Sequence, residues 1–247
     1  MDRDDTPIGR VLTRREALGV LGVSTLGLLG GRSLWDPGKL GPSRSTADPG
    51  CVVRPEQMEG PYFVDERLNR SDIRSDPVTG AVKEGTPLAL VLAVADVRDG
   101  ACTPLVGAHV DVWHCDATGV YSDVKDPGFD TRGQRFLRGY QITDSKGEAR
   151  FQTIYPGWYE GRAVHIHFKI RTDPGAGRGT EFVSQLYFDD ALNSRVLGRM
   201  PYAAKGNAPS RNAADEIFAD GGEQLILLPK ETGRGYAARF VVGLEAV

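Results

Sequence analysis

The sequence predicts an all-β protein, a β-sandwich with one or two short helices, preceded by a signal segment and a linker. From about residue 87 onward, short runs of β-branched and aromatic residues alternate with turns that contain Gly or Asp. This spacing is typical of a sandwich or barrel rather than of βαβ units. The composition, 40% apolar and 26% charged, is that of an ordinary globular chain and indicates neither a disordered protein nor a membrane bundle.

Each strand is expected where a run of apolar residues is bounded by turn residues. The runs are residues 88–97, 108–113, 137–143, 148–154, 163–171, 181–188, 224–228 and 236–244. The Asp-Ser-Lys-Gly sequence at residues 144–147 predicts a tight turn between two of them. Short helices are expected at residues 190–199 and 213–218.

The N-terminal segment, residues 1–30, has the pattern of an export signal. Arg14 and Arg15 stand directly before a weakly hydrophobic run that is rich in Gly and Leu. The run is shorter than the roughly 20 residues that cross a bilayer, and the arginine pair favours the twin-arginine export machinery as a partner. The expected location is therefore extracellular or in the cell envelope, and a buried core helix is the alternative.

The rest of the chain divides into a linker and one folded domain. Residues 31–50 are crowded with Gly and Pro, which indicates a linker, so the folded domain spans residues 51–247. The net charge is −3, and no Lys/Arg stripe is present. A mildly acidic chain without a basic stripe argues against nucleic acid as a partner.

The strand expected at residues 163–171 has a regular alternation of side chains. One face is apolar, with Val164, Ile166, Phe168 and Ile170, and the other carries His165, His167 and Lys169. Because alternate residues of a strand point the same way, the two histidines can reach one metal ion. Taken alone, such a pair is more often exposed or merely hydrogen-bonded.

Three motifs, taken together, carry more information than the histidine pair. They are W-x-x-x-A-x-G-x-Y at residues 113–121, P-G-x-Y at residues 156–159 and R-x-x-H-x-H at residues 162–167. The combination resembles the intradiol ring-cleavage dioxygenases, the type that includes catechol 1,2- and protocatechuate 3,4-dioxygenases. The resemblance runs from about residue 59 to residue 188 and is closest to secreted, single-domain members, whose sandwich fold it also implies.

The resemblance implies one non-haem iron(III) ion per chain, held by Tyr121, Tyr159, His165 and His167. This donor set suits the ion, because phenolate is a hard, anionic ligand that favours Fe(III) and imidazole binds iron generally. Tyr155, four residues before Tyr159, is the alternative second tyrosine. Tyr159 is preferred because it occupies the P-G-x-Y position.

Further roles follow from the same resemblance. Arg162 and Gln185 fall where the family keeps polar groups beside the iron, and a guanidinium there can stabilise negative charge on the substrate ring. Tyr159 is expected to leave the metal and take up a substrate proton. Pro61 and Tyr62 resemble one wall of the substrate pocket, with a merely structural turn as the alternative.

The activity implied is that of an oxidoreductase in aromatic compound catabolism. It cleaves a small catechol-type diol with O₂ between the hydroxylated carbons and yields a cis,cis-muconate-type diacid. One alternative is an exported β-sandwich binding or structural module with a vestigial metal site. Another is a metal-dependent hydrolase that uses His165 and His167. The sequence leaves the ring substituents of the substrate and the oligomeric state open.

The three cysteines fit no zinc motif. In an oxidising compartment one disulfide and one free thiol is the simplest arrangement. Cys51 and Cys102 lie in loop-like sequence on either side of the first strand, whereas Cys115 stands beside the loop that ends at Tyr121. We therefore expect a Cys51–Cys102 disulfide and a reduced Cys115.

Overall fold

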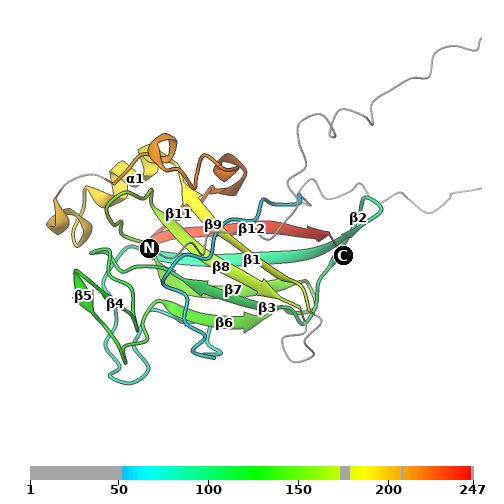
Figure 1. The fold of residues 1–247 in the computed structure, drawn as a ribbon, viewed down its shortest axis with the longest axis horizontal. Helices are drawn as coiled ribbons and strands as arrows, with labels where there is room; N and C mark the ends of the chain where they lie inside the picture. Colours follow the sequence, from blue (N-terminus) through cyan, green and yellow to red (C-terminus); the bar gives the residue numbers. More distant parts are fainter. Residues whose placement is uncertain (1–51, 173–178, 207–208, 246–247) are drawn as a thin grey trace, which may run out of the picture. The chain divides into compact units, whose positions relative to one another are not determined.

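A computed structural model describes residues 52–172, 179–206 and 209–245 of the chain (Figure 1). Within these ranges, two five-stranded sheets form a sandwich, accompanied by a two-stranded hairpin and one α-helix. The predicted fold class is confirmed. Most predicted strands differ from the observed ones by only a few residues at their ends.

The first sheet is centred on its longest strand, β1 (Pro87–Arg98). The parallel strand β12 (Gly235–Glu245) pairs with β1 on one side, and the short β11 (Lys230–Thr232) lies beyond it. Two antiparallel strands pair with β1 in succession, β7 (Glu148–Ile154) along its first half and β2 (Ala101–Pro104) along its second. The β1–β12 pair therefore joins the N-terminal and C-terminal parts of the domain.

The second sheet carries the histidine motif on a central strand. Its order is β10 (Ile226–Leu227), β9 (Glu181–Phe188), β8 (His165–Arg171), β3 (His109–Trp113) and β6 (Arg138–Ile142). All neighbours are antiparallel except β10 and β9. Side chains of β3, β8 and β9 at matched register positions can therefore meet on one face of the sheet.

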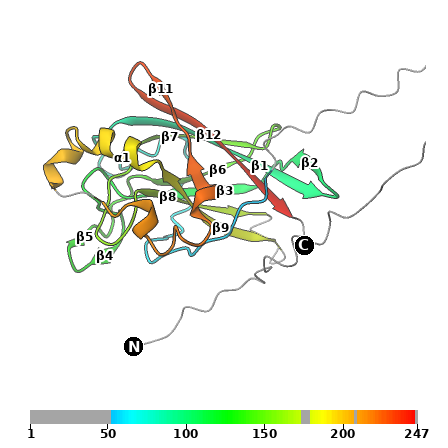
Figure 2. The same cartoon turned by 90° about the horizontal axis from the view of Figure 1, so that it is seen from above.

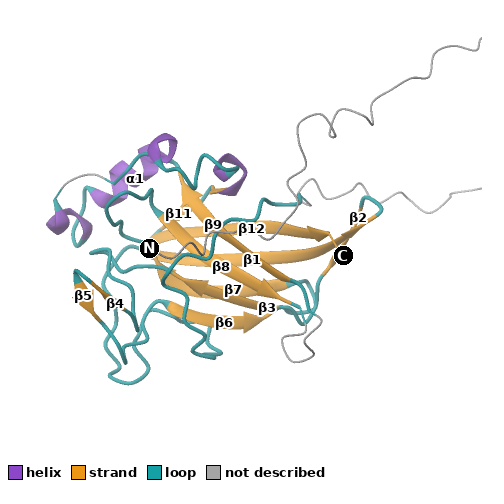
Figure 3. Ribbon diagram, in the orientation of Figure 1, coloured by secondary structure: helices purple, strands orange, loops and turns teal. Residues whose placement is uncertain are grey.

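The remaining elements are short. They are the α-helix α1 (Asp190–Leu197), the 3₁₀ helices Tyr202–Lys205, Asn212–Ala214 and Gly222–Leu225, and the hairpin strands β4 (Lys125–Asp126) and β5 (Phe129–Asp130). Helix α1 begins where the Asp189 carboxylate accepts the N–H groups of Ala191 and Leu192, which have no partner within the helix. The helical segments gather at one end of the sheets (Figures 2 and 3).

The core lies between the inner faces of the two sheets. Its members alternate along the strands, as period-two side-chain placement requires. They include Leu88, Leu90, Leu92, Val94, Val164, Ile166, Phe168 and Ile170. Each of these side chains is at most 1% exposed, so the predicted apolar face of β8 is confirmed.

Two predictions about the elements need correction. Residues 213–218 do not form the expected helix, because only Asn212–Ala214 forms a 3₁₀ turn before a series of turns. The buried Asp215 carboxylate accepts the N–H groups of Ile217 and Phe218 and so competes with regular helical bonding. The strand expected at residues 224–228 is reduced to β10, because Gly222–Leu225 is a 3₁₀ helix.

The cysteine prediction is supported as far as the described residues reach. Cys115 is a buried free thiol and Cys102 is disulfide-bonded, whereas Cys51 lies outside the described residues. We expect an alkylating reagent applied in denaturant without a reductant to label Cys115 alone. Cys102→Ser is expected to cost about 2–4 kcal/mol of unfolding free energy, because a cross-link restricts the unfolded chain. Mass spectrometry that finds label on Cys51 or Cys102 would contradict the pairing.

The predicted signal segment and linker, residues 1–30 and 31–50, also lie outside the described residues. Within the described ranges, no helix is both long enough and apolar enough to span a bilayer.

Candidate metal centre

The two histidines of β8 point away from the sandwich core yet are buried. His165 is 2% exposed and His167 is 1% exposed, because loops cover the outer face of the second sheet. At matched register, Trp113 of β3 and Gln185 of β9 flank His167 on either side. The Trp113 ring stacks on the imidazole of His167 with centroids 5.0 Å apart and planes 7° apart. Three neighbouring strands thus fix this part of the site.

A tight turn delivers Tyr121 to the same face. The Asp116 carboxylate accepts the N–H groups of Thr118 and Val120, which closes the turn after β3. Gly119 in this turn has a φ of +88°, and a Cβ there would lie 2.2 Å from the Trp158 carbonyl oxygen. Glycine is needed both for the backbone conformation and for the close approach of the two loops. Tyr121 itself is 1% exposed.

The loop that carries Tyr159 is held against the Tyr121 turn by Lys205. The Lys205 ammonium donates to the carbonyl oxygens of Thr118, at 2.8 Å, and of Trp158. It also lies 4.4 Å from the centroid of the Trp158 ring. One lysine from a distant segment therefore joins the two tyrosine-bearing loops.

Four donor atoms converge at the resulting site. Nε2 of His165 lies 3.3 Å from Tyr121 Oη, 3.4 Å from Tyr159 Oη and 3.1 Å from His167 Nε2. Two ligands bound at about 2.1 Å to a common ion, with an angle of about 90–110° between them, are separated by about 3.0–3.4 Å. The observed separations therefore fit a single metal ion among the four side chains.

The imidazoles are in the state that binds a metal. His165 Nδ1 donates to the Ala163 carbonyl oxygen at 2.7 Å, so its Nε2 presents a lone pair to the cluster. Burial, reinforced by the charge of Arg162, lowers the pKa of His165 to about 3. Burial and the neighbouring His165 lower the pKa of His167 well below its ordinary value. Nδ1 of His167 is buried and makes no hydrogen bond to any described residue.

The phenols need a cation before they ionise. Burial raises the pKa of Tyr121 well above its ordinary value, and burial also raises the pKa of Tyr159. A metal ion supplies the missing positive charge and can deprotonate such ligands outright. Among the described residues, no group of three or more His, Cys, Asp or Glu side chains could hold a metal. The donor atoms offered here are two phenol oxygens and two imidazole nitrogens, and hard anionic oxygen suits Fe(III).

Arg162 faces the cluster from the segment that leads into β8. Its guanidinium donates to Tyr159 Oη at 3.3 Å, to Gln185 Oε1 at 2.6 Å and to Asp215 Oδ2 at 2.9 Å. Burial opposes the charge of Arg162, but the oxygens of Tyr159 and Asp215 raise its pKa above the ordinary value. Gln185, at matched register with His167, is fully buried rather than exposed to solvent. Arg162 and Gln185 thus lie beside the donor cluster, where sequence reasoning placed them.

Tyr62 forms a wall over the tyrosine pair. Its ring stacks on Tyr121 with centroids 4.4 Å apart and meets Tyr159 edge-on at 6.0 Å. The Tyr62 hydroxyl donates to the Asp126 carboxylate of β4 at 2.8 Å. Pro61 is exposed beside Tyr62. The structure therefore brings Tyr62 into contact with the cluster.

The alternative second tyrosine has a different place in the structure. Tyr155 is fully buried in the main core, where its hydroxyl donates to Asn193 Oδ1 at 2.6 Å and its ring packs on Phe188. His114 is also engaged elsewhere, since its ring nitrogens lie 2.8 Å from the Cys115 carbonyl oxygen and 2.6 Å from the Thr153 hydroxyl. Neither side chain contacts the donor cluster.

Several residues at the site were not anticipated from the sequence. Asp215, Lys205 and Asp126 each contact a site residue or its loop from a segment with no recognisable motif. Arg138 is 3% exposed, and its side chain donates to the Ser122 hydroxyl at 2.7 Å and to the Tyr62 carbonyl oxygen at 3.3 Å. It ties the Tyr121 loop to the Tyr62 segment. A buried arginine between two motifs leaves no periodic signal in the sequence.

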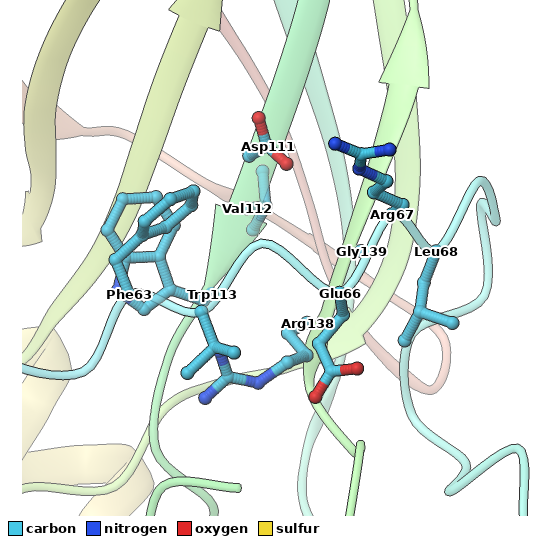
Figure 4. Close-up of a pocket in the computed structure, with 10 residues that line it drawn as sticks. Phe63, Glu66, Arg67, Leu68, Asp111, Val112, Trp113, Arg138 and Gly139 are labelled. Carbon is cyan, nitrogen blue, oxygen red and sulfur yellow. The ribbon is translucent and has the colours of Figure 1, made fainter. Parts of the chain in front are cut away.

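A small cavity of about 10 Å³ is lined in part by Trp113 (Figure 4). Phe63, Glu66, Asp111 and Arg138 are among the residues that line it. The volume suffices for about one water molecule. This cavity is too small for an aromatic ring.

Comparisons of sequence agree with this geometry. A family model described as Dioxygenase matches residues 58–205. The protocatechuate 3,4-dioxygenase beta chain of Burkholderia cepacia is 34% identical over 189 residues, which cover 72% of this chain and 77% of that protein. A chlorocatechol 1,2-dioxygenase of Pseudomonas putida is 28% identical over 156 residues, which cover 53% of this chain. The match spans about half of that relative, 52% of its length.

Solved structures give the same result. An intradiol ring-cleavage dioxygenase from Tetranychus urticae matches with a TM-score of 0.69 and 29% identity over 79% of this chain and 95% of its own. The dioxygenase domain of a carbohydrate-binding fusion protein from Streptomyces sp. SirexAA-E matches with a TM-score of 0.55 and 28% identity. That match covers 79% of this chain and all of the domain.

Proposed function

Because this chain belongs to the intradiol ring-cleavage dioxygenases, we propose that it uses Fe(III) and O₂ to open catechol-type rings between the two hydroxylated carbons. The product is a cis,cis-muconate-type diacid, and both atoms of O₂ are incorporated into it. The observation that carries the proposal is the convergence of two phenols on two neutral imidazoles, with separations of 3.1–3.4 Å around His165 Nε2.

Tyr121, Tyr159, His165 and His167 would hold the iron. Bound there, Fe(III) supplies Lewis acidity, which withdraws electron density from a chelated catechol and prepares the ring for reaction with O₂. Tyr121 and both imidazoles are enclosed by protein and keep the site dry. The stack of Tyr62 on Tyr121 provides an aromatic wall against which a flat substrate can be oriented.

Tyr159 is the ligand suited to move a proton. It is the less buried of the two tyrosines, and its loop faces solvent through Glu160 and Gly161. When a catechol binds, the Tyr159 oxygen takes up a substrate proton at Oη and acts as the base. The Arg162 guanidinium, 3.3 Å from that oxygen, donates to it in either state.

Arg162 and Gln185 act on the substrate side of the site. A fixed guanidinium in a buried setting stabilises negative charge on the ring better than mobile water does. Gln185 is held in turn, because its amide nitrogen donates to the Met58 carbonyl oxygen at 3.1 Å. The Arg162–Gln185 bond of 2.6 Å then sets the direction of both side chains.

The alternatives receive less support. A catalytic zinc site in a hydrolase has three protein ligands, typically His, Asp, Glu or Cys. The described residues offer no such group of three, and two tyrosines stand in their place. A role as a binding module does not explain why Arg162 and Gln185 form a buried pair beside the donor atoms.

The proposal is tested by incubating the iron-loaded full chain with a panel of catechols, with and without O₂. We expect about one O₂ consumed per ring opened, a colourless diacid as product, and no reaction without O₂. Chromatography against authentic standards is needed, since cleavage beside the diol gives a yellow semialdehyde of the same mass. Formation of that isomer, or no O₂ uptake with any catechol, would contradict the proposed function.

We also propose export by the twin-arginine route. Replacing Arg14 and Arg15 together by lysine is expected to leave an uncleaved precursor in the cytoplasm, because the transport receptor reads the arginine pair. Cell fractionation followed by immunoblotting checks this. Unchanged export of the double variant would indicate the general secretory route.

A further inference from the structure

Asp215 is a buried carboxylate with an unusually complete set of donors. Its side chain is 0% exposed. Oδ2 accepts from Arg162 Nε at 2.9 Å and from the Ala163 backbone N–H at 2.7 Å. Oδ1 accepts from the backbone N–H groups of Ile217 and Phe218 at 2.8 and 3.1 Å. A carboxylate has about four lone-pair positions, so all of its accepting capacity is used.

The contact with Arg162 fixes the direction of the guanidinium. This group is planar and presents its donors as a rigid fork, so holding the Nε edge sets the positions of both Nη atoms. With Nε on Asp215, Nη1 donates to Tyr159 Oη and Nη2 donates to Gln185 Oε1. Arg162 is thus held at one end by Asp215 and faces the donor cluster with the other.

The contact with Ala163 reaches the cluster by a second route. The Ala163 peptide N–H donates to Asp215, and the Ala163 carbonyl oxygen accepts from His165 Nδ1 at 2.7 Å. That bond determines which nitrogen of His165 presents its lone pair to Tyr121 and Tyr159. One carboxylate therefore braces both the arginine and the backbone that orients a proposed metal ligand.

We propose that Asp215 is the positioning residue of the site, which holds the Arg162 guanidinium against Tyr159 and Gln185 and fixes the start of β8 that orients His165. This inference rests on the proposed function. Asp215 acts through Arg162 and His165, and it touches neither the donor cluster nor a reacting atom. The negative charge of Asp215 contributes to this role as well as its hydrogen bonds, because Asp215 is the counter-ion of the buried Arg162.

The test compares Asp215→Asn, Arg162→Gln and the double variant in the iron-loaded protein. An amide can accept at only one of its two ends, so Asp215→Asn loses bonds on one side and leaves the arginine without a counter-ion. We expect kcat to fall about 10–100-fold, with KM within about threefold and iron retained. The fall in kcat of the double variant should be well short of the product of the two single losses, because both changes remove the Arg162–Asp215 ion pair and only the Ala163 contact can add to the loss. Losses that multiply in the double variant would overturn the proposal.

Two further variants separate positioning from a general loss of structure. Asp111→Asn breaks the Asp111–Arg171 ion pair, whose side chains are 11% and 12% exposed, on the same sheet and away from the cluster. It should leave kcat unchanged, and a fall equal to that of Asp215→Asn would overturn the assignment. Arg162→Lys keeps the charge beside Asp215 but cannot reach Tyr159 and Gln185 at once. It folds with Asp215 intact and is expected to be as slow as Arg162→Gln, whereas wild-type kcat would overturn the proposal.

A readout in the metal-free protein distinguishes this inference from the proposed function. The Arg162 Nε–H, buried on Asp215, is expected to give a slowly exchanging signal in ¹⁵N NMR spectra, assigned by its loss in Arg162→Gln. In Asp215→Asn that signal should exchange at least about tenfold faster, and in Asp111→Asn it should be unchanged. Unaltered exchange in Asp215→Asn would overturn the positioning role even if the enzyme is active. Absence of ring cleavage by the wild type would count against the proposed function alone.

Discussion

Replacing Tyr121 by Phe, or His165 by Ala, is expected to leave a folded protein that no longer retains iron. Tyr121 is proposed to supply one of the two anionic ligands. His165 Nε2 lies within 3.1–3.4 Å of the other three donor atoms. A buried site that has lost either donor has too little negative charge or too few ligands for Fe(III). Metal analysis after dialysis should show at least about a tenfold lower iron content than in the wild type.

The matched controls make the same two types of substitution, Tyr→Phe and His→Ala, at residues outside the site. Tyr155→Phe removes one buried hydroxyl, which donates to Asn193, and is expected to cost about 1 kcal/mol of unfolding free energy without loss of iron. His109→Ala removes a histidine from β3 of the same sheet, where its ring packs against Tyr140. If Tyr121→Phe and His165→Ala keep full iron and full activity, the assignment of the four ligands is wrong.

Tyr159→Phe is expected to abolish most of the activity for a different reason. The variant keeps three of the four donors and can retain iron, but it has lost the oxygen proposed to take up the substrate proton. A base placed at the reacting group contributes roughly 10²–10⁴-fold, so kcat should fall by at least about 100-fold. Steady-state kinetics at saturating catechol, with iron content measured on the same sample, checks the prediction.

Tyr155→Phe serves again as the control, because the two tyrosines are four residues apart and only one can occupy the second ligand position. Wild-type kcat is expected for Tyr155→Phe. The reverse result, an inactive Tyr155→Phe and an active Tyr159→Phe, would reassign the position despite the geometry.

Much of the fold could be predicted because its strands carry local patterns. Strong apolar runs with turn residues at both ends placed β7 and β9 at the observed bounds. The strands not anticipated are β2, β4, β5 and β11, each of two to four residues. Segments of that length hold too few residues to show a period, and their pairing depends on neighbours that lie elsewhere in the chain.

The residues of the candidate site also fall into two groups, those that the sequence could predict and those that it could not. Tyr121, Tyr159, His165 and His167 belong to compact motifs, so their grouping could be predicted from spacing and resemblance. Asp215 could not, because it meets Arg162 across 53 positions of sequence and sits in a segment whose composition favoured a helix. Lys205 reaches the two tyrosine loops across 87 and 47 positions of sequence. Contacts made only in the folded chain leave no pattern in the sequence.

Two phenols and two imidazoles are proposed to hold one ferric ion. The most direct measurement is metal content together with visible absorption on one sample of purified, folded protein, titrated with catechol in the absence of O₂. We expect about one iron per chain and a phenolate-to-iron(III) charge-transfer band that shifts as catechol binds. A colourless protein that holds zinc, or one that takes up iron without such a band, would contradict the claim.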